Sequence, residues 1–245
     1  MSKILVTGGA GFIGSNFVHY LMDNTDHEVT VLDSLTYAGN KASLVDLPSN
    51  RFTFVHGDIR DAELVDELFS KNDTVVHYAA ESHNDNSLDN PRPFLETNII
   101  GTYTLLEAAR KYDTRLHHIS TDEVYGDLEQ FNYRETETRF ECIEKPHGFD
   151  ETTTLEFHSP YGCSKGSADQ YMLDYARVFG LKTVVFRHSS MYGGRQFATY
   201  DQGWIGWFCQ KAVEAKRGPL KEPFTISGTG KQVRDVLHAD DMTRL

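Results

Sequence analysis

Hydrophobic and polar positions follow two different rhythms along most of the chain. Short apolar runs typical of buried strands occur at residues 3–7, 28–33, 52–56, 74–78, 116–120 and 183–187. Apolar residues spaced three or four positions apart predict helices at residues 15–22, 62–70, 94–112 and 160–179. This alternation predicts an α/β fold, a doubly wound parallel sheet with helices on both faces.

A glycine-rich turn follows the first predicted strand. Gly8, Gly11 and Gly14 form a G-x-x-G-x-x-G pattern, which permits a tight turn and close approach of a pyrophosphate to a helix N-terminus. A plain strand–turn–helix is the alternative for the glycines alone. The second strand, however, ends at Asp33, whose carboxylate can accept hydrogen bonds from a ribose and would repel a 2′-phosphate. The pattern therefore predicts a site for NAD rather than NADP.

Further candidate residues follow the later strands. In a parallel sheet the carboxyl ends of the strands share one edge, where ligands bind. Asp58, after the third strand, is placed to meet the adenine amino group. Ala79 and Ala80, after the fourth, would let a dinucleotide lie against the backbone. Thr121, Asp122 and Glu123 follow the fifth strand, so three loops are expected to converge on one site.

Tyr161 and Lys165 are four residues apart, so on a helix they share one face. Lowering a tyrosine pKa from about 10 to about 7 needs roughly 4 kcal/mol of preference for the phenolate. Lys165 and a cationic nicotinamide ring are expected to contribute to this preference by charge proximity. The phenolate would then remove a hydroxyl proton from a sugar, with Thr121 hydrogen-bonded to the same hydroxyl. A chance pair on a helix is the alternative.

Asp122 and Glu123 distinguish the possible reactions. Once an alcohol becomes a ketone, the hydrogen on the adjacent carbon is acidic, and Glu123 is placed to remove it as general base. Asp122, if burial keeps it protonated, can donate a proton to a departing hydroxyl. The two residues together predict loss of water. A helix cap or a surface acid pair is the alternative.

Charge narrows the choice of partners. The 245-residue chain has a formal net charge of −12. Residues 1–181 carry 14 Lys and Arg against 30 Asp and Glu, whereas residues 182–245 carry 10 against 6. The acidic body argues against nucleic acid as a partner. The basic end favours a phosphorylated small molecule, with ordinary surface variation as the alternative.

Composition also bears on compartment and metal binding. The chain has no apolar run long enough to span a membrane and no N-terminal leader pattern. Cys142, Cys163 and Cys209 are widely spaced, which indicates neither disulfides nor a zinc site and favours the reducing cytoplasm. His117 and His118 point to opposite faces of a strand, and the other histidines lack H-E-x-x-H spacing. We therefore expect no metal site.

Two features concern surfaces. Residues 127–158 form an irregular acidic stretch with 9 Asp and Glu against 3 Lys and Arg, which is either a lid over the substrate or a solvated loop. The helices at 94–112 and 160–179 carry apolar stripes that pack mostly on the sheet. A surplus on these stripes would pair two subunits, so we expect a homodimer.

The whole chain resembles extended short-chain dehydrogenase/reductases that act on nucleotide-linked sugars, although its two parts resemble different members. Residues 1–126, including the glycine turn, residues 77–87 and the Thr-Asp-Glu at 121–123, are similar to dTDP-glucose 4,6-dehydratases. Residues 127–245, including F-H-S-P-Y-G-C-S-K at 157–165 and residues 186–197, are similar to CDP-paratose 2-epimerases. Those epimerases typically have Asn-Lys at 122–123, because oxidising carbon 2 and inverting the ketone needs no elimination acid or base.

The resemblance implies a Rossmann-type NAD-binding domain over residues 1–187, including the Tyr/Lys helix, and a small, apparently truncated substrate domain over residues 188–245. The catalytic residues it implies are Thr121, Asp122, Glu123, Tyr161 and Lys165. The implied cofactor-binding residues are Gly8, Gly11, Phe12, Ile13, Gly14, Asp33, Asp58, Ile59, Ala79, Ala80, Tyr161 and Lys165. The implied substrate-binding residues are His83, Ser190, Arg195 and Arg234. The two arginines would face the substrate diphosphate, because a planar guanidinium can bind two oxygens.

Three functions fit these residues. The acid–base pair favours NAD-dependent 4,6-dehydration of a dTDP-glucose-type nucleotide sugar. The later half of the chain favours 2-epimerisation of a CDP-linked dideoxyhexose. A third function, from a different class, is a truncated NAD-binding module without catalysis.

Overall fold

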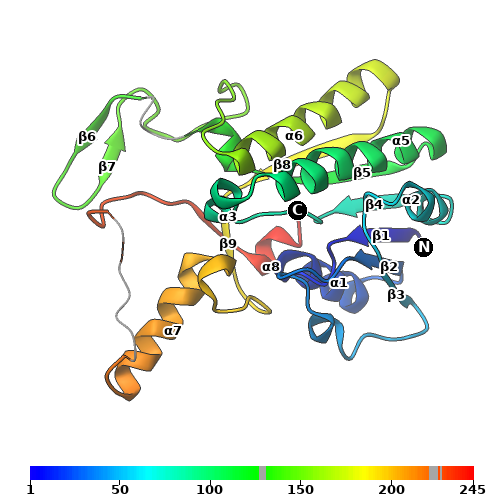
Figure 1. The fold of residues 1–245 in the computed structure, drawn as a ribbon, viewed down its shortest axis with the longest axis horizontal. Coiled ribbons are helices and arrows are strands. Elements are labelled where there is room, and N and C mark those ends of the chain that lie inside the picture. The colour runs from blue at the N-terminus through cyan, green and yellow to red at the C-terminus, as the bar shows by residue number, and fades with distance from the viewer. Residues whose placement is uncertain (127–130, 221–225, 227) are drawn as a thin grey trace.

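A six-stranded parallel sheet forms the centre of the molecule, with strand order β3-β2-β1-β4-β5-β8 (Figure 1). The computed structural model describes residues 1–126, 131–220, 226 and 228–245. The strands are β1 (Lys3–Thr7), β2 (Glu28–Asp33), β3 (Phe52–His56), β4 (Thr74–His77), β5 (Arg115–Thr121) and β8 (Thr183–His188). The chain runs outward from β1 to β3 and then returns to β4 on the other side of β1. The predicted doubly wound α/β fold is confirmed.

Helices cover both faces of this sheet because side chains along each strand alternate between the faces. Ile4 and Val6 of β1 pack in one cluster with Val18 of α1 (Phe12–Asn24). Leu5, between them, packs on the opposite face with Leu105 of α5 (Thr102–Tyr112). The helices α2 (Ala62–Phe69) and α6 (Pro160–Phe179) lie on this second face. Full burial of each such aliphatic side chain contributes about 1.5–3 kcal/mol.

Local signals explain why α6 begins and ends where the sequence predicts. The Ser159 hydroxyl accepts a hydrogen bond from the Gly162 N–H at 3.0 Å, and Pro160 takes the first helical position. The helix ends at Phe179, and the next residue, Gly180, has a φ of +72°, the left-handed conformation that glycine adopts without strain. These caps fix the start of the helix that carries Tyr161 and Lys165.

The predicted helix at 94–112 is not one regular helix. The chain passes from α4 (Arg92–Phe94) through a π-helical segment, η2 (Leu95–Gly101), into α5. Within η2, Asn98 is buried and its side chain donates to the Glu81 carbonyl (2.9 Å) and the Ser164 hydroxyl (2.8 Å) while accepting from the Glu81 N–H (2.9 Å). The wider π-helical turn places the Asn98 side chain inside the protein. Such turns are frequent near functional sites.

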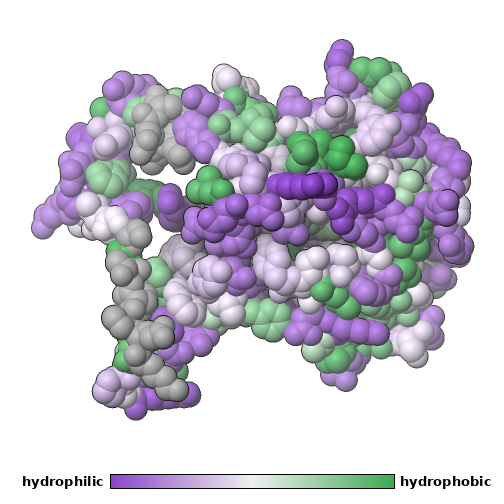
Figure 2. Space-filling model, viewed as in Figure 1, coloured by the Kyte–Doolittle hydropathy of each residue, from purple (hydrophilic) through white to green (hydrophobic). Residues whose placement is uncertain are grey.

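Several smaller elements surround the sheet. They are η1 (Lys41–Leu44), α3 (Asn84–Asp89), η3 (Asp122–Tyr125), β6 (Tyr133–Glu135), β7 (Phe140–Cys142), β9 (Ser190–Tyr192), η5 (Tyr200–Gln202), α7 (Trp204–Arg217), β10 (Val236–His238) and α8 (Ala239–Met242). The antiparallel β6–β7 pair and α7 project from the body (Figure 1), and the hairpin surface is mostly hydrophilic (Figure 2). β9 pairs with β10, and α8 returns to pack near α1. The domain division at residue 187 stays a prediction.

The structure describes residues 131–158 of the predicted acidic stretch, and residues 127–130 lie outside the described residues. The described part contains the β6–β7 hairpin, and Lys231 donates to Glu135 (2.8 Å) and to the Thr136 carbonyl (2.9 Å). The hairpin is therefore tied to the C-terminal segment. Among the described helices, none is long and apolar enough to cross a bilayer.

Buried histidines make stability depend on pH. Burial lowers the pKa of His77 to about 3 and that of His118 well below its usual value. The folded pKa values lie below the unfolded value of about 6.5, so the unfolded chain gains protons first as pH falls. The associated stability is present above about pH 6.5 and is lost below it.

We expect His118→Leu to weaken this dependence. Neither ring nitrogen of His118 bonds to a described residue, so leucine removes the titrating group without breaking a recorded bond. Between about pH 6 and 4 the unfolding free energy of the parent should fall with decreasing pH, and that of His118→Leu should fall less steeply. The two slopes should differ by the binding of about one proton, or ~1.4 kcal/mol per pH unit. Urea unfolding at several pH values measures this slope. His147→Leu, at an exposed position, is the control and should leave the slope as in the parent. Equal slopes for parent and His118→Leu would contradict the assignment.

Candidate active site

A cavity of about 600 Å³ opens at the carboxyl edge of the sheet. Its walls come from the segments that follow β1, β2, β3, β4, β5 and β8, together with the start of α6. The predicted site residues that line it are Gly8, Gly11, Phe12, Ile13, Gly14, Asp33, Asp58, Ile59, Ala79, Ala80, His83, Thr121, Glu123, Tyr161, Lys165 and Ser190. The sequence prediction that separate loops converge on one site is confirmed.

The glycine turn is built for close backbone contact. Gly8 has a φ of +71°, and a Cβ there would lie 2.4 Å from the Ala79 nitrogen. A Cβ on Gly14 would lie 2.4 Å from the Gly8 carbonyl oxygen. Gly11 precedes α1 and lines the cavity, and no described side chain caps this helix. The first N–H groups of α1 are thus available to an anion, which fits the pyrophosphate of a dinucleotide.

Asp33 is held rigidly at the end of β2. Its Oδ2 accepts from the Ala10 N–H and its Oδ1 from the Leu35 N–H, both at 2.8 Å. Each carboxylate oxygen has a second lone pair for a ligand hydroxyl. A fixed negative charge at this point of the cavity fits a ribose with free hydroxyls and disfavours one carrying a phosphate.

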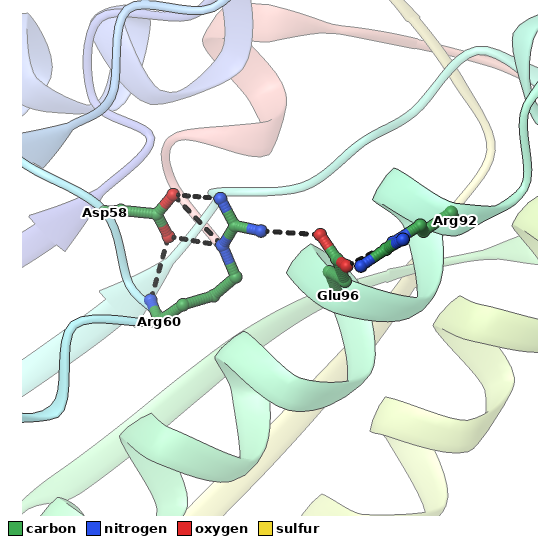
Figure 3. A network of polar contacts seen from close by, with 4 residues as sticks. All are labelled: Asp58, Arg60, Arg92 and Glu96. Atoms are coloured by element: carbon green, nitrogen blue, oxygen red, sulfur yellow. Dashed lines mark hydrogen bonds and ion pairs between the residues drawn. The ribbon is translucent and has the colours of Figure 1, made fainter.

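Asp58 lines the cavity and lies in a network of polar contacts with Arg60, Glu96 and Arg92 (Figure 3). Its Oδ2 receives Nη2–H of Arg60 at 2.7 Å, and Oδ1 receives the Arg60 backbone N–H at 2.8 Å. Arg60 also donates to Glu96 at 2.8 Å, and Arg92 donates to the other Glu96 oxygen at 2.6 Å. The Arg60 guanidinium holds the pKa of Asp58 below its usual range. Asp58 is therefore held in place in its ionised form, and its role as an acceptor for the adenine amino group stays a prediction.

Sequence reasoning missed a buried residue that supports the wall of the cavity. Asn98 bonds both backbone groups of Glu81 and the hydroxyl of Ser164, so it links the loop after β4 to α6. Arg60, His188 and Gln196 also line the cavity and were not predicted. A polar residue among apolar positions of a helix was the available signal for Asn98. The arrangement of the other three depends on chain segments that only the fold brings together.

Tyr161 and Lys165 share one face of α6 and both line the cavity, as predicted. Lys165 is buried and donates to the Ile119 carbonyl at 2.5 Å. Burial lowers the pKa of Lys165 to about 8, against the opposing charge of Asp169. Burial also raises the pKa of Tyr161, and the nearby carboxylates of Glu123 and Asp122 act in the same direction. The protein by itself thus shifts the pKa of Tyr161 in the direction opposite to the sequence expectation, because burial outweighs the hydrogen bond from Thr121, which lowers the pKa.

Thr121 fixes the start of the turn that carries Asp122 and Glu123. Its hydroxyl caps η3 by accepting the Glu123 N–H at 3.2 Å, and its side chain is hydrogen-bonded to Tyr161. Glu123 lines the cavity, whereas Asp122 lies beside it on the same turn. Although Asp122 keeps an exposed surface, the protein packed around its carboxyl group raises its pKa, against the bond to Thr121 and the charge of Arg234. The turn therefore holds a carboxyl group biased toward its protonated form next to a second carboxyl group.

The predicted substrate residues are only partly brought together. His83 and Ser190 line the cavity. Arg234 lies close enough to Asp122 to act on its pKa. Arg195 instead donates to Asn16 at 3.2 Å and lines a smaller hollow beside α1, outside the main cavity lining. The Arg195 backbone has a φ of +64°, in the left-handed region. The diphosphate-binding roles of both arginines stay predictions.

The described residues contain no group of three or more metal-ligating side chains. His77 bonds to Thr7 (2.7 Å) and Thr102 (3.0 Å), and its ring lies 5.1 Å from that of His118. These histidines lie inside the protein under the sheet edge.

Comparison with known proteins gives the family. Residues 4–245 match the model of the NAD-dependent epimerase/dehydratase family. The chain belongs to this family. NAD as the cofactor and the nucleotide-sugar enzyme class are confirmed at the level of the family.

Three similar proteins illustrate the relationship. The chain is 58% identical to CDP-paratose 2-epimerase of Salmonella typhi, over 99% of this chain and 73% of that protein. It is 45% identical to a dTDP-glucose 4,6-dehydratase of Mycobacterium tuberculosis, over 98% of this chain and 66% of that protein. The structure of the Streptomyces venezuelae dTDP-glucose 4,6-dehydratase with NAD bound matches with a TM-score of 0.82 and 39% identity, over 99% and 70% of the two chains. The chain thus spans about two thirds to three quarters of these relatives.

We expect Asp33→Asn to weaken NAD binding and reduce its preference over NADP. The change keeps the shape but removes the charge that binds ribose hydroxyls and repels a 2′-phosphate. Loss of a charge-assisted bond corresponds to roughly 10- to 100-fold weaker NAD binding. Calorimetric titration with NAD and NADP measures both affinities.

Asp73→Asn is the matched control, because Asp73 also accepts a backbone N–H (from Lys3, 2.9 Å) but precedes β4, at the opposite edge of the sheet. Unchanged NAD affinity and unchanged preference in Asp33→Asn would refute this role.

Proposed function

We propose that this member of the family catalyses 4,6-dehydration of a nucleotide-linked hexose of the dTDP-glucose type. The observation that carries the proposal is the pair Asp122 and Glu123 on η3, beside the Tyr161–Lys165 pair of α6 and the same cavity. A reaction confined to oxidation and reduction would use only the second pair. The first pair supplies an acid and a base for removing water.

The redox half of the site is supported by its contacts. NAD, when bound, supplies the acceptor and later the donor of hydride. Tyr161 would take the proton of the sugar hydroxyl, and its hydrogen bond to Thr121 fixes its orientation. Lys165 is buried, with 4% of its surface exposed, and donates to the Ile119 carbonyl. It would supply an ammonium group one helical turn from Tyr161. A cationic group in the cavity would oppose the upward shift of the Tyr161 pKa.

The elimination half uses the two carboxyl groups differently. Because its pKa is raised, Asp122 is suited to donate a proton to a departing hydroxyl. Glu123, which lines the cavity, is suited to remove the proton from the carbon beside the ketone. Two neighbouring carboxyl groups in unlike environments can serve as acid and base in one reaction.

Glu123→Gln should abolish water loss while leaving NAD bound. An amide cannot accept the proton, and general-base catalysis contributes about 10²- to 10⁴-fold. Mass spectrometry of the product from dTDP-glucose, with calorimetry of NAD binding alongside, measures both. Glu151→Gln, an exposed carboxylate in the neighbouring loop, is the control. Dehydration by Glu123→Gln at the parent rate would show that another group is the base.

A second candidate function is 2-epimerisation of a CDP-linked dideoxyhexose. The 58% identity to a CDP-paratose 2-epimerase over nearly the whole chain favours it. The same experiment separates the two candidates, since CDP-paratose would give a product of unchanged mass. A third candidate, an NAD-binding module without catalysis, predicts tight NAD binding and no turnover with either nucleotide sugar.

We also propose that two copies of the chain associate through α5 and α6. Tyr171, Val178 and Phe179 recur along one face of α6 and are 47%, 52% and 44% exposed. Tyr103 of α5, 46% exposed, approaches the same face, because it interacts with Tyr175. Exposed aromatic and aliphatic side chains gathered on one surface are typical of protein interfaces.

The free cysteines fit a reducing compartment such as the cytoplasm.

Val178→Glu should convert such a dimer into a monomer, because the interface would have to bury an unpaired charge. Light scattering coupled to gel filtration measures the mass. Leu173→Glu changes a similarly exposed residue (44%) on a different face of α6 and should leave the mass unchanged. A parent protein that is monomeric at all concentrations would contradict the proposal.

A further inference from the structure

A buried ion pair joins α6 to the last strand of the sheet. Asp169 is 0% exposed and lies one helical turn beyond Lys165, on the same side of α6. Arg187 of β8, whose side chain is 14% exposed, donates to both of its oxygens, Nε to Oδ2 at 2.8 Å and Nη2 to Oδ1 at 2.9 Å. This two-pronged geometry restricts both side chains more than a single contact would.

The same guanidinium reaches the turn that carries the acid–base pair. Nη1 of Arg187 donates to the Tyr125 hydroxyl at 2.7 Å, and the guanidinium carbon lies 5.1 Å from the centre of that ring. Tyr125 is 6% exposed and is the last residue of η3, which begins at Asp122. One arginine therefore connects the helix of Tyr161 and Lys165 with the turn of Asp122 and Glu123.

The connection lies behind the site rather than in it. Among the described residues, the cavity lining includes none of Asp169, Arg187 and Tyr125. Nearby, the backbone already packs closely, since a Cβ on Gly162 would lie 3.2 Å from the Glu123 carbonyl oxygen. Backbone packing limits how near α6 and η3 can come, and the arginine bridge limits how far apart they can move.

We propose that Asp169, Arg187 and Tyr125 are positioning residues that hold the acid–base turn η3 at a fixed distance from the Tyr161–Lys165 pair. This inference rests on the proposed function for its catalytic consequence. Proton removal at one sugar carbon and water loss at its neighbours require both pairs to reach one ring simultaneously. A displacement of about 1 Å is enough to cost roughly 100-fold in rate.

Tyr125→Phe is the sharpest test. It keeps the ring beneath the guanidinium and the Asp169–Arg187 pair but removes the oxygen that accepts from Arg187. We expect kcat for dehydration to fall about 10- to 100-fold with KM within about twofold and NAD affinity unchanged. Hydrogen exchange of residues 122–126 should rise about tenfold, because a contact that closes the turn is lost.

The double variant Asp169→Leu with Arg187→Met separates positioning from folding. Replacing a buried ion pair by apolar residues is often neutral for stability, so we expect a melting temperature within about 5 °C of the parent but the kcat loss of Tyr125→Phe. Asp174→Asn with Arg177→Met, an exposed ion pair on the same helix, is the control and should change neither quantity.

The outcomes distinguish this inference from the proposed function. The inference is overturned if Tyr125→Phe keeps the kcat of the parent, whether hydrogen exchange of residues 122–126 becomes faster or stays unchanged. A folded double variant with parent-like kcat overturns it as well, and if the double variant does not fold, Tyr125→Phe decides alone. If the parent enzyme turns over neither nucleotide sugar, the proposed function fails. Hydrogen exchange in Tyr125→Phe then tests the inference independently: faster exchange of residues 122–126 supports it, and unchanged exchange overturns it.

Discussion

Parallel pairing of the six strands is the constraint on which the site depends. Because β1 pairs in parallel with both β2 and β4, and β4 with β5, every strand ends at the same edge. The loops after these strands carry the glycine turn, Asp33, Ala79 and Thr121, which lie far apart in the sequence. An antiparallel neighbour would place its loop at the opposite edge. The cavity is therefore a direct consequence of strand direction.

Burial at this edge acts on each ionisable group in the same sense, because it favours the neutral form. It lowers the pKa of Lys165 to about 8 and raises the pKa values of Tyr161 and Asp122. A raised pKa suits Asp122 to its proposed role as the acid of the elimination. The raised pKa of Tyr161 works against the phenolate that a base requires. Positive charge beside the phenol opposes this shift, and both the Lys165 ammonium and the cationic form of the family's cofactor can supply it.

The sequence predicts those parts of the fold that local physics determines. Strand β3 and helix α6 have their predicted bounds, because an apolar run between turns and the Ser159, Pro160 and Gly180 signals act over a few residues. The π-helical turn at Asn98 depends on partners at Glu81 and Ser164, which no local pattern reveals. The direction of Arg195 toward Asn16 is similarly set by distant chain segments. Motif spacing predicts which residues meet at the cavity, whereas tertiary packing decides where their side chains point.

The 58% identity to a CDP-paratose 2-epimerase and the adjacent carboxyl groups of Asp122 and Glu123 favour different reactions. Sequence identity counts every aligned position of the surface and the core, whereas the choice between the two reactions depends on two side chains. The raised pKa of Asp122 means that its surroundings disfavour the ionised carboxylate. Epimerisation makes no use of such an acid. Elimination of water does, so the environment of Asp122 is the stronger physical argument for the dehydratase reaction.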